Sequence, residues 1–181
     1  MVILASLETY QVVLLVLMIA TFLYIVVLLY VAGHGMEFAK RLRARTKALL
    51  TLMSEKRRLL LLLDGELRHY QAAYEESDEE AVSALKSLNL MEITYKEAKD
   101  TLSFIGRVET RLRFLGHDLD GFEKDPQCVE WLASLEEIDH SIRRGTSFYN
   151  MEAAALNYWV SIPMAGWINY LFGIKKRDPI V

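Results

Sequence analysis

The sequence has little cysteine, proline and glycine, and each shortage excludes a class of fold. The 181 residues contain one Cys, so the chain cannot form an internal disulfide framework or a zinc site built from cysteines. Three Pro and nine Gly are few for a β-sandwich, which needs such residues in its many turns. With 52% hydrophobic and 25% charged residues, intrinsic disorder is a poor interpretation. The net charge of −3 favours neither nucleic acid nor an acidic substrate.

Charged side chains are also missing from one long stretch, residues 9–36. As an α-helix these 28 residues would be about 42 Å long, against a hydrocarbon core of about 30 Å. A helix in a soluble core carries a polar stripe, and residues 12–32 carry none. A signal peptide has a shorter apolar region and a basic N-terminus, whereas Glu8 is the only charge before this stretch. We therefore expect residues 1–36 to be a retained membrane anchor.

Basic residues follow the apolar stretch and none precedes it. The cluster directly after it consists of Lys40, Arg41, Arg43, Arg45 and Lys47. The positive-inside rule predicts that this side is cytoplasmic and that the N-terminus lies outside, in a single-pass protein of the cell (inner) membrane. The cluster is either a solvated helix face or a contact for anionic lipid headgroups. Because it lacks interleaved aromatic residues, we expect no nucleic-acid partner.

The chain after the anchor shows the apolar periodicity of long helices. Over residues 37–76, apolar side chains recur close to every 3.5 residues. These positions are Leu49, Leu52, Leu59, Leu63, Leu67, Tyr70 and Tyr74. Only Gly33 and Gly35 interrupt the path from the anchor, so we expect one long helix with a weak joint at these two residues.

Two further helices are indicated by their capping residues. Ser77 followed by Glu80 matches a capping box, and apolar side chains then recur at steps of three and four over about five heptads. This seam consists of Ala81, Leu85, Leu88, Met91, Tyr95, Ala98, Leu102, Ile105, Val108, Leu112 and Leu115. Asp125 followed by Pro126 marks the start of a third helix. The pattern predicts an all-α fold in which residues 37–152 form an antiparallel bundle of three to four long helices.

The C-terminal part, residues 153–181, contains a second uncharged segment at residues 153–174. If it crossed a membrane, the basic run at residues 175–177 would lie outside, against the charge rule, and Pro163 would be costly in lipid. We expect the segment to pack on the bundle or to lie at the membrane interface. The aromatic candidates for headgroup level are Trp159, Trp167 and Tyr170.

Residue pairs in this part of the chain carry a recognisable motif. The motif positions are Tyr149, Asn150, Leu156, Asn157, Ile162, Pro163, Phe172, Gly173 and Ile174. They resemble the C-terminal Tyr-Asn, Tyr-Asn, Phe-Pro, Phe-Gly-Phe pattern of the LemA family, and Arg57 and Arg58 are similar to that family's Arg-Arg pair. The Tyr-Asn after the membrane span and the Ile-Pro of the first bundle helix are missing. The chain therefore resembles a divergent member.

The resemblance implies an N-terminal transmembrane helix, a helical bundle and no assigned reaction. Members of the family are associated with membrane-protein quality control and with organelle-membrane assembly. Independently of the family, Asn150 and Asn157 are seven residues apart and share a helix face. We expect their side chains to cap turns of a neighbouring segment rather than to bind a ligand.

Two Glu-x-x-His motifs suggest an enzyme, because such motifs on facing helices are ligands of di-iron bundles. They are Glu66 with His69 and Glu137 with His140. On a helical wheel His69, Glu137 and His140 point away from the apolar faces of their helices. We therefore expect no catalytic residue, metal or cofactor, and a carboxylate-bridged di-metal enzyme is the least favoured alternative.

Together these features predict a non-enzymatic membrane scaffold or adaptor that acts through its helical bundle. Long amphipathic helices offer lengthwise, coiled-coil-like surfaces, so we expect a homo-oligomer, with the lipid bilayer and other membrane proteins as partners. The alternative is a membrane-shaping or organelle-membrane assembly protein. In that case the aromatic C-terminal segment and the basic cluster would hold the bilayer while the bundles polymerise.

Overall fold

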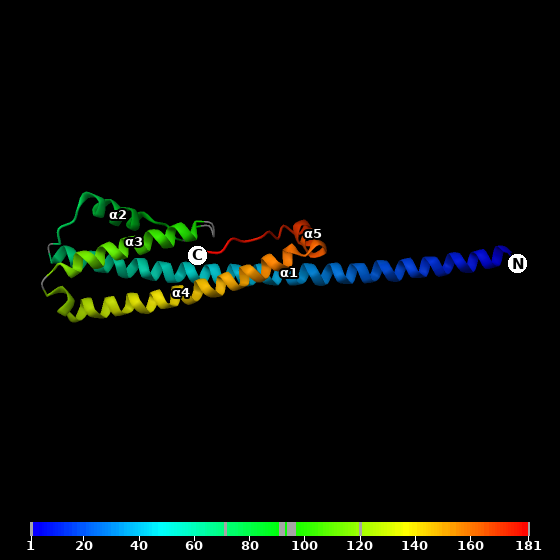
Figure 1. Ribbon diagram of the computed structural model, residues 1–181, viewed down its shortest axis with the longest axis horizontal. Helices are drawn as coiled ribbons and strands as arrows, with labels where there is room; N and C mark the ends of the chain where they lie inside the picture. The colour runs from blue at the N-terminus through cyan, green and yellow to red at the C-terminus, as the bar shows by residue number, and fades with distance from the viewer. Residues whose placement is uncertain (1, 71, 91–92, 94–96, 120, 181) are drawn as a thin grey trace. The chain divides into compact units, whose positions relative to one another are not determined.

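The first helix joins the predicted anchor to the first bundle segment without a break. In the computed structural model, which describes residues 2–70, 72–90, 93, 97–119 and 121–180, helix α1 is Val2–His69 (Figure 1). The expectation of one long helix is confirmed, although it ends earlier than residue 76. The hydroxyl of Tyr74 donates to Asp64 Oδ1 at 2.9 Å, whereas ten residues of continuous helix span about 15 Å. The chain therefore turns back after His69.

The remaining elements are also helical. They are α2 (Glu76–Ser87), α3 (Ala98–His117), the 3₁₀ turn η1 (Phe122–Lys124), α4 (Pro126–Ser161) and α5 (Pro163–Leu171). No strand occurs in the described ranges, so the predicted all-α class is confirmed. Two compact units divide the chain: the first is Met1–Arg41 with Ala154–Arg177, and the second is Leu42–Ala153 with Asp178–Val181. The predicted functional division into residues 1–36, 37–152 and 153–181 stays a prediction.

The predicted single helix over residues 77–116 is wrong, because α2 and α3 are two helices that fold back on each other. Arg111 Nε donates to Asp78 Oδ1 at 2.7 Å, whereas 33 residues of continuous helix would separate them by about 50 Å. The capping box of α2 is formed by Glu75 and Asp78 instead of the predicted pair. Two predicted seam residues, Met91 and Tyr95, lie outside the described residues.

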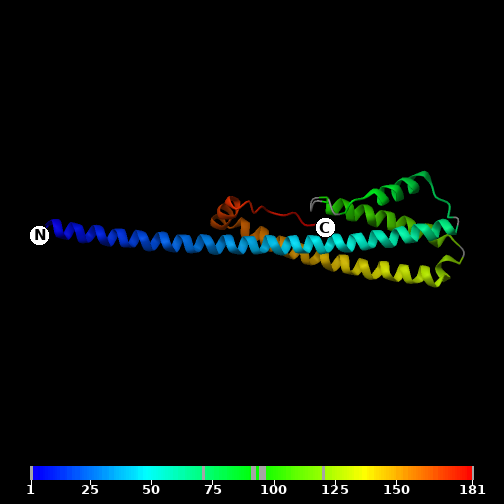
Figure 2. The ribbon, with the colours of Figure 1, turned by 180° about the vertical axis from the view of Figure 1, so that it is seen from behind.

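In the second unit, α3 and α4 flank residues 42–69 of α1, and α2 covers α3 (Figures 1 and 2). The start of α4 is capped as predicted, since Asp125 Oδ1 accepts from the Gln127 amide at 2.8 Å. Tyr70, directly after α1, donates a hydrogen bond to Asp125, directly before α4. Arg45, earlier in α1, stacks on Phe148, later in α4, so the two helices run antiparallel. The buried side chains include Leu49, Met53, Leu60, Leu63, Leu67, Val82, Leu85, Ile105, Leu112, Cys128, Leu135, Ile142 and Tyr149.

A buried ion triad connects three helices of this unit. The ammonium group of Lys56 on α1 pairs with Glu109 on α3 and with Asp139 on α4. The Lys56 side chain is 5% exposed and that of Glu109 is 9% exposed, and Arg113 also pairs with Glu109 at 2.8 Å. Charges held this far from water are tolerated only when they are paired, so the triad restricts how the helices can align.

We expect Lys56→Met to lower the free energy of unfolding by about 3–5 kcal/mol, because the buried Glu109 carboxylate and the half-buried Asp139 carboxylate lose their shared cation. Denaturant unfolding followed by circular dichroism measures the loss. Lys47→Met is the matched control, since Lys47 is exposed on the same helix. Adding Glu109→Gln and Asp139→Asn to Lys56→Met should restore much of the stability. A Lys56→Met protein as stable as the wild type would contradict a structural role for the triad.

Acid should destabilise the α2–α3 pair through Asp78. The Arg111 guanidinium lowers the pKa of the buried Asp78 carboxyl below its usual value. Such a group stabilises the fold above its unfolded pKa of about 3.9, and that contribution is lost as the pH falls through the lower folded pKa. The free energy of unfolding should therefore drop below about pH 4, and Asp78→Asn should flatten this dependence. Exposed Asp118→Asn is the control, and equal acid profiles for all three proteins would exclude the assignment.

Candidate membrane-interface site

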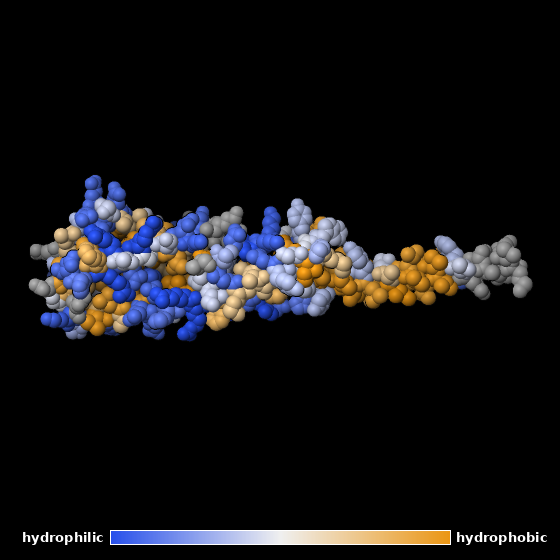
Figure 3. Space-filling view, viewed as in Figure 1, coloured by the Kyte–Doolittle hydropathy of each residue, from blue (hydrophilic) through white to orange (hydrophobic). Residues whose placement is uncertain are grey.

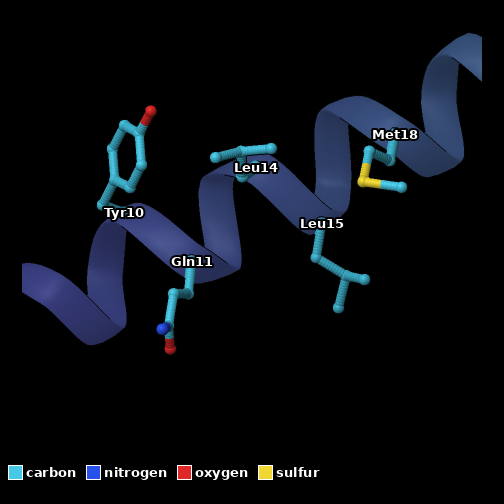
Figure 4. Close-up of a pocket in the computed structure, with 5 residues that line it drawn as sticks. All are labelled: Tyr10, Gln11, Leu14, Leu15 and Met18. Atoms are coloured by element: carbon cyan, nitrogen blue, oxygen red, sulfur yellow. The ribbon is translucent and has the colours of Figure 1, made fainter.

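The first part of α1 exposes apolar side chains on every side. Between Tyr10 and Tyr30 the exposed large side chains have exposed fractions of 40% to 66% (Figure 3). In Figure 4, Tyr10, Gln11, Leu14, Leu15 and Met18 project from this helix in different directions. In the described part of the chain, α1 is the one helix that is long and apolar enough to cross a membrane. The predicted candidate span is therefore present.

Aromatic side chains stand at both ends of this exposed surface. Tyr10 and Tyr30 are 66% and 61% exposed. The helix between them is about 30 Å long, which equals the thickness of a bilayer's hydrocarbon core. Tyrosine is enriched where a membrane-spanning segment meets water. The length and its aromatic ends therefore fit a single crossing.

At the C-terminal end of the exposed surface, α1 gains a packing partner. Val31 and Ala32 of α1 form a buried cluster with Ala165 and Ile168 of α5. Leu28, Trp159 and Ile162 pack against the cluster. The C-terminal helix is therefore fixed to the last turns of the apolar run, and both belong to the first unit.

Helix α5 lies close against α1 at Gly35. A Cβ atom at this position would lie 1.9 Å from Asn169 Oδ1 and 3.0 Å from Ile174 Cδ1. Asn169 is fully buried; its Nδ2 donates to the Ala165 carbonyl at 2.7 Å, while its Oδ1 has no partner among the described residues. Glycine is therefore required by packing, because any side chain would push α5 away. The expected weak joint at Gly33 and Gly35 is instead continuous helix.

The predicted aromatic interface residues lie around this contact. The ring of His34 is 4.5 Å from that of Tyr30 and 5.8 Å from that of Trp159, measured between centroids. Trp159 is half-buried, whereas Trp167 and Tyr170 are 57% and 72% exposed on α5. These two side chains have no core to fill and face outward.

Three residues shape the ends of α5. Pro163 is its first residue, where the missing amide hydrogen costs nothing. Gly166 lies so close to Val160 that a Cβ would be 2.3 Å from its carbonyl oxygen. At the other end Gly173 has φ +70°, Phe172 is the C-cap residue, and the Ile174 amide donates to Asn169 at 2.8 Å. This is a Schellman motif, and it explains the glycine of the Phe-Gly-Ile sequence.

The asparagines of the motif hold the extended C-terminal segment by its backbone. Asn157 forms two hydrogen bonds with Arg177: its Nδ2 donates to the carbonyl at 2.7 Å, and its Oδ1 accepts from the amide at 2.8 Å. In the second unit, Asn150 Oδ1 accepts from the Ile180 amide at 2.9 Å, and Tyr149 donates to the Asp178 carbonyl. Both asparagine side chains were predicted to cap turns of a neighbouring segment; they do bond to the backbone of another segment, but that segment has no turn at Arg177 or Ile180.

The five basic candidates are all exposed, and two of them have contacts within the chain. Arg41 pairs with Glu37 one turn earlier, and Arg45 lies 5.1 Å from the centre of the Phe148 ring. Lys40, Arg43 and Lys47 are exposed on α1. Their side chains are therefore accessible to solvent or to headgroups.

The two arginines of the upstream motif differ in role. Arg57 donates to the carbonyls of Leu85 and Lys86, the last turn of α2, where a cation also meets the negative end of the helix dipole. Arg58 pairs with Glu55 on its own helix, and both side chains are exposed. The structure thus gives the Arg-Arg pair one interhelical contact and one surface contact.

The residues of the Glu-x-x-His motifs do not converge. His69, Glu137 and His140 are exposed, as the helical wheel predicted, and Glu66 is half-buried. Among the described residues no three His, Cys, Asp or Glu side chains lie close enough to hold a metal ion. Burial raises the pKa of the Cys128 thiol, which suits a core residue.

Sequence reasoning missed the residues on which the site depends most. The sequence pattern assigns Gly35 to a weak joint and gives no role to Asn169 or Lys56. Each is decided by a contact between distant segments, and no local spacing signals it. The one available signal was Gly35 itself, a glycine inside a predicted helix with no turn to explain it.

Comparison with family models, with curated proteins and with solved structures finds no match to this chain.

Gly35→Ala should displace α5 from α1, because the new Cβ would overlap Asn169. Overpacking of this kind costs about 1–3 kcal/mol, and here we expect it to appear as faster amide hydrogen exchange in α5. Gly33→Ala is the matched control, since nothing lies within 4 Å of a Cβ at Gly33. Equal protection of α5 in both variants would contradict the packing contact.

Proposed function

We propose that this protein is a non-enzymatic, single-pass membrane protein that acts as a scaffold or adaptor on the cytoplasmic side. The observation that carries the proposal is the stretch of α1 from Tyr10 to Tyr30, most of whose large apolar side chains are exposed among the described residues. An isolated apolar helix of this length is stable in lipid and costly in water. The lipid bilayer is therefore the first partner that we propose.

The orientation rests on the basic residues. Lys40 and Arg41 follow the apolar stretch, and Lys175 and Lys176 follow α5, which packs on the same end of it. Basic residues at one end of a span favour its placement in the cytoplasm. We infer that the N-terminus lies outside and the second unit inside the cell, in the cell (inner) membrane.

A scaffold rather than an enzyme is supported by the use made of ionisable side chains. Lys56, Asp64, Asp78 and Glu109 are buried, and each forms ion pairs between or within helices. Groups used in this way stabilise a fold and are not free to transfer protons to a substrate. Long helices with exposed faces supply the surface on which copies of the chain or other membrane proteins would assemble.

Membership of the LemA family, as a divergent member, is part of the same proposal. It is supported by what its motif residues do: Asn150 and Asn157 hold the C-terminal segment, and Gly173 closes α5. A motif whose residues have structural roles is a stronger resemblance than scattered identities. The second candidate function, membrane shaping or organelle-membrane assembly, is favoured by the exposed aromatic side chains of α5.

Cysteine labelling in intact cells tests the topology. In a Cys128→Ala background, a Glu137→Cys variant places an exposed thiol in the second unit, and Thr9→Cys places one before the apolar stretch. An impermeant maleimide should label only the Thr9→Cys variant before the cells are permeabilised. Labelling of the Glu137→Cys variant in intact cells would overturn the cytoplasmic placement, and release of the protein by alkaline carbonate would overturn the anchor itself.

Mass measurement in mild detergent tests the scaffold role. We expect an oligomer or a stoichiometric companion membrane protein, since long amphipathic faces associate lengthwise. A monodisperse monomer without companions would contradict the proposal. Vesicles that are drawn into tubules by the purified full chain would instead favour membrane shaping, and stoichiometric iron or manganese would point to an enzyme.

A further inference from the structure

Helix α5 carries two apolar faces, and only one is used within the chain. Ala165, Ile168 and Asn169 face α1 and are buried. The opposite side consists of Met164, Trp167, Tyr170 and Leu171, which are 55%, 57%, 72% and 60% exposed. We call these four side chains the outer face of α5. A helix that is apolar all round is normally covered on every side, so the outer face needs an occupant.

The position of α5 along the apolar run identifies that occupant. Its inner face packs against Val31 and Ala32, and Asn169 sits in the notch at Gly35. These residues follow Tyr30 directly, at the end of the length that fits a hydrocarbon core. The outer face is therefore held at the depth where lipid headgroups meet acyl chains.

The composition of the outer face fits that depth. Trp and Tyr are the side chains that prefer the interface, because their rings are apolar and each carries one polar group. The exposed Lys175 and Lys176 follow α5 directly, and Ile174 before them reaches Gly35 of α1. Two further exposed basic side chains, Lys40 and Arg41, lie one turn beyond on α1. Aromatic residues followed by basic residues match an interface whose headgroups are anionic.

We propose that α5 is an interfacial membrane helix: its outer face is inserted at the headgroup–acyl boundary of the leaflet entered by the C-terminal end of the α1 apolar stretch. The proposal rests on the membrane anchoring proposed above. It adds a second lipid contact, made by a segment more than a hundred residues after the first. Because Gly35 and Asn169 join the two contacts, α5 enters the leaflet as a helix already docked on α1.

Quenching of tryptophan fluorescence by brominated lipids measures the depth of the outer face. The full chain carrying Trp131→Phe and Trp159→Phe retains only Trp167 and is reconstituted in vesicles of phosphatidylcholine and phosphatidylglycerol. The acyl chains carry bromine either near the headgroup or near the chain end. We expect bromine near the headgroup to remove roughly half of the Trp167 emission, and bromine near the chain end to remove clearly less.

Two matched controls separate insertion from general proximity to lipid. A chain that retains only Trp131, half-buried in α4 of the second unit, should show no quenching by either lipid. Adding Gly35→Ala to the Trp167 chain should reduce the quenching, because α5 is no longer held at that depth, whereas Gly33→Ala should leave it unchanged.

The failure of this proposal can be distinguished from failure of the anchor. If Trp167 is unquenched by both brominated lipids but open to aqueous iodide, while the protein resists alkaline carbonate, the anchor stands and the interfacial helix is wrong. If Trp167 is shielded from both kinds of quencher, another protein surface, such as a second copy, covers the outer face and the proposal is again overturned. Release by carbonate would overturn the anchoring on which it rests.

Discussion

The structure depends above all on one apolar helical surface that the chain itself cannot cover. Between Tyr10 and Tyr30, large side chains are exposed all around α1. Moving one such side chain out of water is favourable by about 1.5–3 kcal/mol. For the whole stretch the transfer free energy is therefore on the order of tens of kcal/mol. A folded domain is stable by only about 5–15 kcal/mol. The described helices leave this surface uncovered, and that exposure is what favours the proposed placement of the segment in a bilayer.

A second constraint follows at the end of that surface, where two helices approach through a glycine. Gly35 leaves the space that the buried amide of Asn169 fills, and Gly173 permits the turn that places Ile174 beside the same notch. The pairing of a small residue with a buried amide is typical of helices packed closely in or near lipid, where small residues let backbones approach. The contact also gives the uncharged C-terminal segment, which contains a proline, a packing partner within the first unit. The segment begins a new short helix at Pro163 and packs sideways on the first.

Sequence patterns predicted the elements whose signals are local. The candidate span, the cap at Asp125 and the buried side chains of Leu49, Leu59, Leu63 and Leu67 in α1 follow from composition, from capping residues and from a period of three to four residues. The same periodicity failed at the α2–α3 pair, because apolar side chains at these steps suit one long helix and two folded helices equally well. The ion pair between Asp78 and Arg111 decides between them, and such a contact between distant residues has no signal in a single sequence. The buried position of Lys56 was missed for the same reason.

The distribution of chemical groups separates the surfaces that stabilise this chain from those that face a partner. In the second unit the buried charged side chains form ion pairs with one another, as in the triad of Lys56, Glu109 and Asp139. Ion pairs of that kind have an unfavourable desolvation free energy, but they restrict how the helices can align. Their presence therefore argues for one defined packing of α1, α3 and α4. In the first unit, by contrast, most of the large side chains between Tyr10 and Tyr30 are apolar or aromatic and exposed. Their chemistry is that of a lipid interface, and it favours the proposed membrane role over the proposal of a reaction.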